Sequence, residues 1–283
     1  MEISRADGSV IAVEETGEPG VSPVLLCHGL ADSRLSAREF APAARDLGLR
    51  ILAPDRPGTG GTGRRRLRWL ADWADDARLI LDGLSTGPVH VLGISAGGPF
   101  AAACAAVMPG RVRSLTLVSP LGAPGWSTRG MARGERMSLE VAGHLPEFGG
   151  WFLGRLAALA RQSPGAFLRV TTSELPDVDR HSLEQPGPRE AFLASYAEAF
   201  RGGSWGVAQD LRLLTRPWGF QLGSIMAPTT IHHGDADTTV PLQHARRYVS
   251  AIPGARLELH PGHGHFSILD APEVLLAPLA RPD

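Results

Sequence analysis

The chain has 283 residues, of which 43% are hydrophobic and 20% are charged. This composition is typical of a globular protein and excludes a disordered, collagen-like or fibrous chain. The formal net charge of −1 at pH 7 argues against a nucleic-acid partner and against a membrane partner held by charge. All 28 basic residues are arginine. The absence of lysine excludes Schiff-base chemistry and a P-loop lysine.

The chain has only two cysteines, Cys27 and Cys104, which excludes a disulfide scaffold and a four-cysteine zinc site. Its first residues lack a basic start and an apolar run, and its longest weakly polar stretch, residues 99–107, is too short to span a bilayer. We therefore expect a cytoplasmic protein, a monomer or homodimer, with no nucleic-acid or membrane partner.

Short apolar runs alternate with longer helical patterns over the first 120 residues. The predicted strands are residues 10–13, 24–27, 51–53, 89–92 and 115–118. The predicted helices are residues 36–47, 67–84 and 96–108. Alternation of this kind indicates a parallel sheet with helices on both faces.

The alternation stops at about Leu121 and returns after Ser224. Between them the pattern is helical, interrupted by proline and glycine, and holds 11 of the 17 aromatic residues. We predict a helical cap over residues 121–224 and a core formed by residues 1–120 and 225–283. The aromatic residues either line an apolar cavity or form the cap's own small core. As substrate-binding candidates we take Trp126, Trp151, Trp205 and Trp218.

Beyond the cap, residues 229–233 and 257–260 are predicted strands, and residues 242–251 and 272–280 are predicted helices.

The sequence Gly93-Ile94-Ser95-Ala96-Gly97 lies between a predicted strand and a predicted helix. A G-x-S-x-G pattern at such a turn is typical of a nucleophilic serine. The two glycines are needed because the nucleophile sits in a strained turn, where side chains two residues away on either side would collide. The N-terminal N–H groups of the helix also point toward the serine.

A serine needs a general base, and the base needs an orienting acid. One predicted strand ends in Gly234-Asp235-Ala236-Asp237, and the last one is followed by Gly262-His263-Gly264-His265-Phe266. An acid and a histidine therefore follow Ser95 in the expected order, each at a strand end. The spacing alone leaves both Asp235 and Asp237 open as the acid.

Five motifs in this order make the chain resemble α/β-hydrolase fold proteins over nearly its whole length. The motifs are His28-Gly29, Asp55-Arg56-Pro57-Gly58-Thr59-Gly60, Gly93-Ile94-Ser95-Ala96-Gly97-Gly98, Gly234-Asp235-Ala236-Asp237 with Val240-Pro241, and Gly264-His265-Phe266. The resemblance implies an eight-stranded, mostly parallel sheet with helices on both faces and a helical cap inserted after the sixth strand.

The resemblance also implies roles for individual residues. Ser95 is similar to the family's nucleophile and His265 to its general base, and Asp237 occupies the motif position of the acid. The backbone N–H groups of Leu30 and Ala96 would form the oxyanion hole, which stabilises charge that develops only in the tetrahedral state. No cofactor is implied.

Three other polar residues of these motifs are predicted to be structural. We expect His28 to brace the oxyanion loop, and Asp55 and Arg56 to hold the loop after the fourth strand by ion pairing. His263 has a spacing to His265 that could mimic a metal pair, but no carboxylate or cysteine cluster accompanies it. We therefore predict no metal site.

A serine at the turn argues against haloalkane dehalogenases and epoxide hydrolases of this fold, which use an aspartate there. Acyl transfer to water remains, by a carboxylesterase, lipase-like esterase, thioesterase, amidase or carbon–carbon bond hydrolase. We predict a serine carboxylester hydrolase that acts on a small to medium apolar substrate through an acyl-enzyme on Ser95. Two alternatives stay open. One is a lyase, cyclase or cofactor-free haloperoxidase-like enzyme with the same triad, and the other is a ligand-binding receptor.

Overall fold

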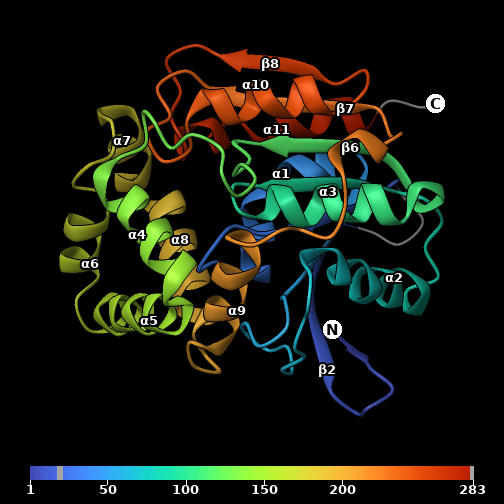
Figure 1. Cartoon of the computed structure of the whole chain (residues 1–283), viewed down its shortest axis with the longest axis horizontal. Helices are drawn as coiled ribbons and strands as arrows, with labels where there is room; N and C mark the ends of the chain where they lie inside the picture. Colours follow the sequence, from blue (N-terminus) through green and yellow to red (C-terminus); the bar gives the residue numbers. More distant parts are fainter. Residues whose placement is uncertain (18–21, 281–283) are drawn as a thin grey trace.

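Eight strands form one mixed sheet in the computed structural model, which describes residues 1–17 and 22–280 (Figure 1). The strands are β1 Glu2–Ser4, β2 Val10–Thr16, β3 Ser22–Cys27, β4 Leu49–Pro54, β5 Val89–Ile94, β6 Val112–Val118, β7 Thr229–Gly234 and β8 Arg256–His260. Their order across the sheet is β1-β2-β4-β3-β5-β6-β7-β8. The pairs β1–β2 and β2–β4 are antiparallel, and the other five pairs are parallel. The predicted eight-stranded, mostly parallel sheet is confirmed.

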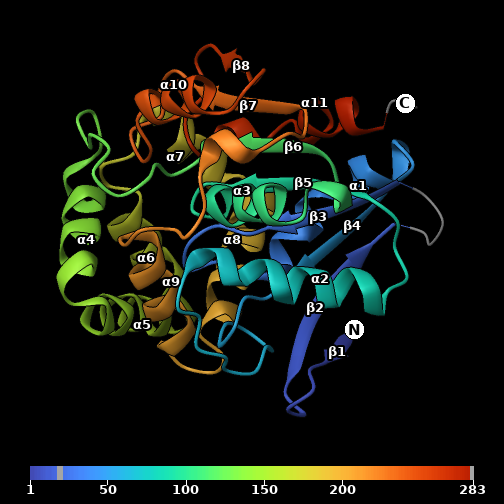
Figure 2. The same ribbon diagram turned by 45° about the vertical axis from the view of Figure 1, so that its right-hand side comes forward.

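Helices cover both faces of this sheet (Figure 2). In β3, Val24 and Leu26 point into the core on one face, while Leu25 and Cys27 point into the core on the other. A strand buried on both faces is apolar at every position, as the sequence pattern of this run indicated. On the first face pack α1 Ala37–Asp46 and α11 Pro272–Leu276. On the second face pack α2 Trp73–Gly83, α3 Gly97–Val107 and α10 Leu242–Ala251.

Two local differences from the predicted elements have tertiary causes. Strand β1 has no apolar pattern of its own and exists through its pairing with β2, with Ile3 opposite Ile11. The helix predicted from residue 67 begins only at Trp73, after a short 3-10 turn, η2 Leu70–Asp72. The Leu67 N–H donates to Gln209 Oε1 in the predicted cap at 3.0 Å, and the N–H groups of Arg68 and Trp69 donate to Asp72 Oδ2 at 2.8 and 2.9 Å, which holds this stretch in a non-helical conformation ahead of η2.

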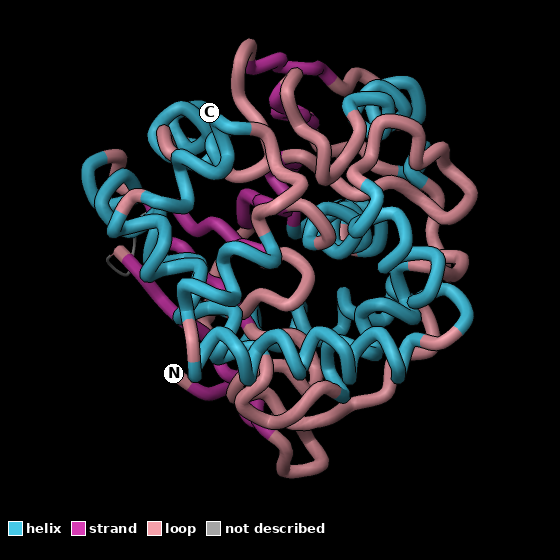
Figure 3. Tube along the Cα trace, turned by 90° about the vertical axis from the view of Figure 1, so that its left-hand side faces the viewer, coloured by secondary structure: helices cyan, strands magenta, loops and turns pink. Residues whose placement is uncertain are grey.

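Six helices lie between β6 and β7 and form a layer beside one end of the sheet (Figures 1 and 3). They are α4 Arg133–His144, α5 Pro146–Gln162, α6 Pro164–Thr171, α7 Asp177–Glu184, α8 Pro186–Ala199 and α9 Trp205–Leu214. The predicted helical insertion after the sixth strand is confirmed. Among the described residues, no helix combines the length and the apolar character that a membrane crossing needs.

The cap has a small hydrophobic core of its own, to which Phe167, Tyr196 and Phe200 contribute. It is also continuous with the rest of the protein, because Leu213 and Trp218 pack into the core on one face of the sheet. The limits 121–224 therefore stay a prediction about where the cap begins and ends.

Candidate active site

Ser95 occupies a sharp turn between β5 and α3, with a φ of 54° that L-residues rarely adopt. A Cβ added to Gly93 would lie 2.5 Å from the Cβ of Ala101, and one added to Gly97 would lie 2.0 Å from the Cys27 carbonyl oxygen. The steric reason for both glycines is thereby confirmed. The Ser95 N–H donates to the Val118 carbonyl oxygen at 2.8 Å, which fixes the turn against β6.

The structure brings Ser95, His265 and Asp237 into one hydrogen-bonded chain. His265 Nε2 lies 3.0 Å from Ser95 Oγ, and His265 Nδ1 lies 2.8 Å from Asp237 Oδ2. The other carboxylate oxygen of Asp237 accepts the N–H groups of Thr239 and Val240 at 2.9 and 2.8 Å. Asp237 is thus held by its own loop, with one oxygen left for the histidine.

Asp235, the other candidate acid, has a different partner. Its exposed carboxylate accepts the Gly262 N–H at 2.7 Å and so joins the two loops that follow β7 and β8. Of the two aspartates that the spacing left open, Asp237 is the one in contact with His265.

The position of Asp237 decides which nitrogen of His265 carries the proton. Nδ1 faces the carboxylate and donates to it, so Nε2 is free to accept the Ser95 hydroxyl proton. Burial lowers the pKa of His265, but the charge of Asp237 and its hydrogen bond, together with the charges of Asp179 and Glu135, raise it more. The net pKa of His265 lies above its ordinary value of 6.5.

We expect kcat/KM to rise with pH, with a midpoint above 6.5. His265 must be neutral to accept the serine proton, and its raised pKa keeps the ring protonated to a higher pH than in a free histidine. The measurement is the rate of a chromogenic ester hydrolysis between about pH 5 and pH 9. A profile that is flat across this range would contradict a histidine base.

The two backbone N–H groups expected to form the oxyanion hole, those of Leu30 and Ala96, belong to two backbone segments that both lie beside Ser95. Ala96 precedes the first turn of α3, where N–H groups lack helical partners. Leu30 follows Gly29, and a Cβ added to Gly29 would lie 3.8 Å from the Cβ of Ser95. The loop of Leu30 therefore passes beside the nucleophile, and its N–H remains, with that of Ala96, the predicted oxyanion hole.

Arg56 and His28 hold this loop. Arg56 donates to the carbonyl oxygens of His28 and Gly29 at 2.6 and 2.7 Å, and His28 Nδ1 lies 3.0 Å from the same Gly29 oxygen. The C=O and N–H of a trans peptide point in opposite directions, so bonds to the Gly29 oxygen fix the direction of the Leu30 N–H. The structure thus gives His28 the bracing contact that was expected of it.

Arg56 is itself held by the cap. Its Nε and Nη2 lie 2.9 and 2.8 Å from Asp210 Oδ2 on α9, and both side chains are buried. The guanidinium also lies over the Phe100 ring, 4.4 Å from its centroid. Arg56 thus forms the expected ion pair, and its partner is Asp210. Asp55 forms its ion pair with Arg34, whose Nη1 lies 2.5 Å from Asp55 Oδ2. No motif pointed to Asp210, because its partner lies far away in the sequence.

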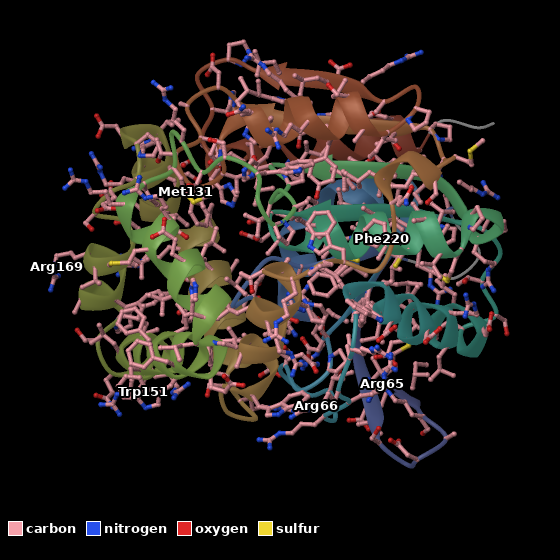
Figure 4. All side chains as sticks on the ribbon, viewed as in Figure 1. Arg65, Arg66, Met131, Trp151, Arg169 and Phe220 are labelled. Atoms are coloured by element: carbon pink, nitrogen blue, oxygen red, sulfur yellow. The ribbon has the colours of Figure 1, made fainter. Side chains whose placement is uncertain are left out.

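The structure does not bring the four candidate tryptophans together at the triad. Trp151 on α5 is 54% exposed, lies beside Phe148 and stands at the outer edge of the cap (Figure 4). Trp205 begins α9 and packs on the loop of Gly58, where a Cβ added to that glycine would lie 2.3 Å from its ring. Arg64 covers the same ring at 5.6 Å.

Trp126 and Trp218 belong to a different cluster. Both rings pack against Tyr248 of α10, with centroids at 5.2 and 6.4 Å, and Trp218 also stacks on Phe220. They line an open groove of about 440 Å³ with Leu222. Within the described parts of the chain, no ring contact or hydrogen bond joins any of the four tryptophans to the triad. Their role in substrate binding thus has no support from their positions.

Other aromatic residues connect the cap to the triad. The Phe266 ring lies 5.4 Å from that of His265, and Phe192 of α8 packs on Phe266 edge to face at 5.5 Å. Tyr196 continues this row into the core of the cap, 6.0 Å from Phe192. On α4, Glu135 is accessible to solvent and close enough to His265 to raise its pKa. Neither Phe192 nor Glu135 stands in a motif, so only the packing of the cap reveals them.

Comparison with known proteins finds a matching family model and relatives that are named as hydrolases. Residues 22–272 match the family model described as alpha/beta hydrolase fold. Uncharacterized hydrolase YcgS of Bacillus subtilis is 29% identical over 268 residues, which cover 94% of this chain and 91% of that protein. 2-Hydroxymuconate semialdehyde hydrolase of Pseudomonas putida is 27% identical over 258 residues, which cover 89% of this chain and 83% of that protein.

Among solved structures, an esterase from Exiguobacterium antarcticum superposes with a TM-score of 0.70 at 21% identity and covers 99% of both chains. A bromoperoxidase from Bacillus anthracis superposes with a TM-score of 0.73 at 21% identity and covers 99% of this chain and 98% of that one. At this identity the structural likeness concerns the fold.

Proposed function

The chain belongs to the α/β-hydrolase fold family, and on that premise we propose that it is a serine hydrolase that cleaves a carboxylic ester or thioester of a small to medium apolar substrate. The single observation that carries this proposal is the chain of hydrogen bonds from Ser95 through His265 to Asp237. A serine on a strained turn with an oriented, buried base beside it is what acyl transfer requires.

The proposed reaction has two stages. Ser95 Oγ bonds to the acyl carbon while its proton passes to His265 Nε2, and the oxyanion is stabilised by the N–H groups of Leu30 and Ala96. The ester C–O bond, or thioester C–S bond, then breaks, and the leaving alcohol or thiol takes the proton from Nε2. In the second stage a water gives a proton to Nε2 and attacks the acyl carbon, and the proton returns to Ser95 as the acid leaves. Each oxyanion donor is worth about 100- to 1000-fold in rate.

The preference for an apolar substrate is supported by what lies next to His265. Phe266 and Phe192 present aromatic surface beside the base, and Tyr196 links them to the apolar core of the cap. Ring surface of this kind favours an acyl or alcohol group with little charge.

A second candidate is hydrolysis of a carbon–carbon bond beside a carbonyl group. The observation that favours it is the likeness to a relative named as a 2-hydroxymuconate semialdehyde hydrolase, which spans most of both chains. The same triad would serve both reactions, so the choice depends on the substrate that the cap admits.

The test is a panel of nitrophenyl esters of increasing acyl-chain length, run beside labelling with a fluorophosphonate probe. We expect labelling at Ser95 and turnover that depends on chain length. Labelling with negligible ester turnover would instead favour carbon–carbon hydrolysis, or a lyase, cyclase or haloperoxidase-like reaction. Ligand binding without any labelling would contradict a serine hydrolase and favour a receptor.

The acyl-chain profile should respond to Phe192 and not to Trp151. We expect Phe192→Ala to change the ratio of long-chain to short-chain turnover several-fold, because its ring packs on Phe266 beside His265. Trp151→Ala is the matched control on the same cap, since that ring stands on the outer surface. Equal changes in both variants, measured with the ester panel, would show that the cap acts through its stability and not through this ring.

A further inference from the structure

Asp179, on α7 of the cap, is fully buried and accepts four hydrogen bonds from the segment that carries His265. Its Oδ2 accepts the His265 N–H at 2.8 Å. Its Oδ1 accepts the N–H groups of Phe266 and Ser267 at 3.0 and 2.9 Å and the Ser267 hydroxyl at 3.0 Å. Three consecutive backbone N–H groups and one hydroxyl therefore converge on one carboxylate.

These donors have no helix or strand to satisfy them. The segment is the start of a 3-10 turn, η5 Ser267–Leu269, and the first N–H groups of such a turn lack partners within it. Buried N–H groups that lose their only acceptor are costly, so the loop keeps this conformation as long as Asp179 is present. Ser267 Oγ also accepts the Gly264 N–H at 2.8 Å, which closes the network around the histidine.

The fit between α7 and this loop is close. A Cβ added to Gly264 would lie 2.3 Å from Asp179 Oδ2, so the glycine before His265 makes room for the carboxylate. A second bond, from Ser182 Oγ on α7 to Asp270 Oδ1 at 2.6 Å, ties the same helix to the far end of the turn. The cap is thus joined to both ends of η5.

We propose that Asp179 is a positioning residue for the triad: it holds the backbone of His265 so that the imidazole reaches both Ser95 and Asp237. The inference rests on the proposed serine hydrolase chemistry and adds that the cap, in addition to covering the site, completes the catalytic geometry. His265 lies in the loop that follows strand β8 of the sheet, while Asp179, which fixes its backbone, lies on helix α7 of the cap.

The charge of Asp179 also acts on the imidazole, together with other groups around it. Asp237 and His233 face His265 from β7 and its loop, Glu135 from α4 and Asp179 from α7. Burial lowers the pKa of His265, and the three carboxylates raise it, with Asp237 the largest of them. The charge of His233, when protonated, opposes them. Loss of the Asp179 charge alone therefore moves the pKa of His265 downward.

The experiment compares the rate constant for fluorophosphonate labelling of Ser95 in the wild-type protein and in Asp179→Asn across pH. We expect a loss of about 10- to 100-fold at the pH of maximal rate, since a displaced base costs this much. We also expect the acid limb of the profile to move to lower pH. Asp177→Asn is the matched control, because that carboxylate lies on the same helix and its side chain is 93% exposed. It should behave as wild type.

Three results would distinguish failure of the positioning role of Asp179 from failure of the proposed function. A folded Asp179→Asn protein with the wild-type labelling rate and acid limb would overturn the positioning role. A lower melting temperature with an unchanged acid limb and unchanged rate would do the same, since it would show a purely structural residue. Absence of labelling in the wild-type protein itself would instead contradict the proposed function.

Ser267→Ala keeps the proposal testable if Asp179→Asn does not fold. This variant removes one donor to Asp179 and leaves its charge in place. We expect a several-fold slower labelling rate with an acid limb at the wild-type pH, because position is disturbed and charge is not. A labelling rate equal to that of the wild type would overturn the role of the network.

Discussion

Replacing Ser95 by alanine is expected to abolish fluorophosphonate labelling and to reduce ester turnover by about four to six orders of magnitude. The reason is that Oγ is the atom that forms the acyl-enzyme, and His265 Nε2 has no other serine within hydrogen-bond distance among the described residues. Alanine keeps the Cβ at the same positive φ, so the strain of the turn is unchanged and the melting temperature should shift little.

The matched control for this variant is Ser119→Ala. Ser119 directly follows the neighbouring strand β6 and also has a positive φ, and its buried Oγ has no hydrogen-bond partner among the described residues. It should retain labelling and turnover. If Ser95→Ala kept wild-type turnover, the nucleophile would have to be another residue, and the proposed acyl-enzyme would be wrong.

The second large effect is expected from Asp237→Asn, with a loss of about 10⁴ in kcat, as in protease triads that lose their orienting acid. The carboxylate Oδ2 accepts the proton on His265 Nδ1. An amide can present its NH₂ group there instead, which favours the tautomer with the proton on Nε2. That tautomer cannot accept the proton of Ser95. The steady-state rate of ester hydrolysis is the measurement, with circular dichroism to show that the variant is folded.

Asp235→Asn is the matched control on the same loop. Its carboxylate is exposed and accepts only the Gly262 N–H among the described contacts, so we expect a loss of about tenfold or less. The opposite pattern would assign the acid to Asp235. Small and equal losses in both variants would mean that neither aspartate orients His265.

The sequence by itself determined strands β2 to β8, the helices on both faces of the sheet and the turn at Ser95. These features depend on local chemistry. Strands buried on both faces need continuous apolar runs, as in β3, and a turn with a positive φ at its centre needs small residues around it, as at Gly93 and Gly97. The sequence also predicted that Ser95, the aspartate pair and His265 lie close together, because loops at the carboxyl ends of parallel strands meet at one edge of the sheet.

The tertiary structure alone decided which groups meet those residues. The family resemblance pointed to Asp237, whereas the contact itself depends on the directions of the two side chains: Asp237 reaches His265 and Asp235 reaches the Gly262 N–H. Asp179 and Asp210 lie on cap helices, and no local sequence pattern encodes how these helices are placed on the sheet. The sequence also shows only that the cap is rich in tryptophan, which is equally true whether these side chains line a site or cover a surface. Each of these contacts joins residues far apart in the chain, so its existence depends on how the whole cap packs on the sheet and not on the residues beside it in the sequence.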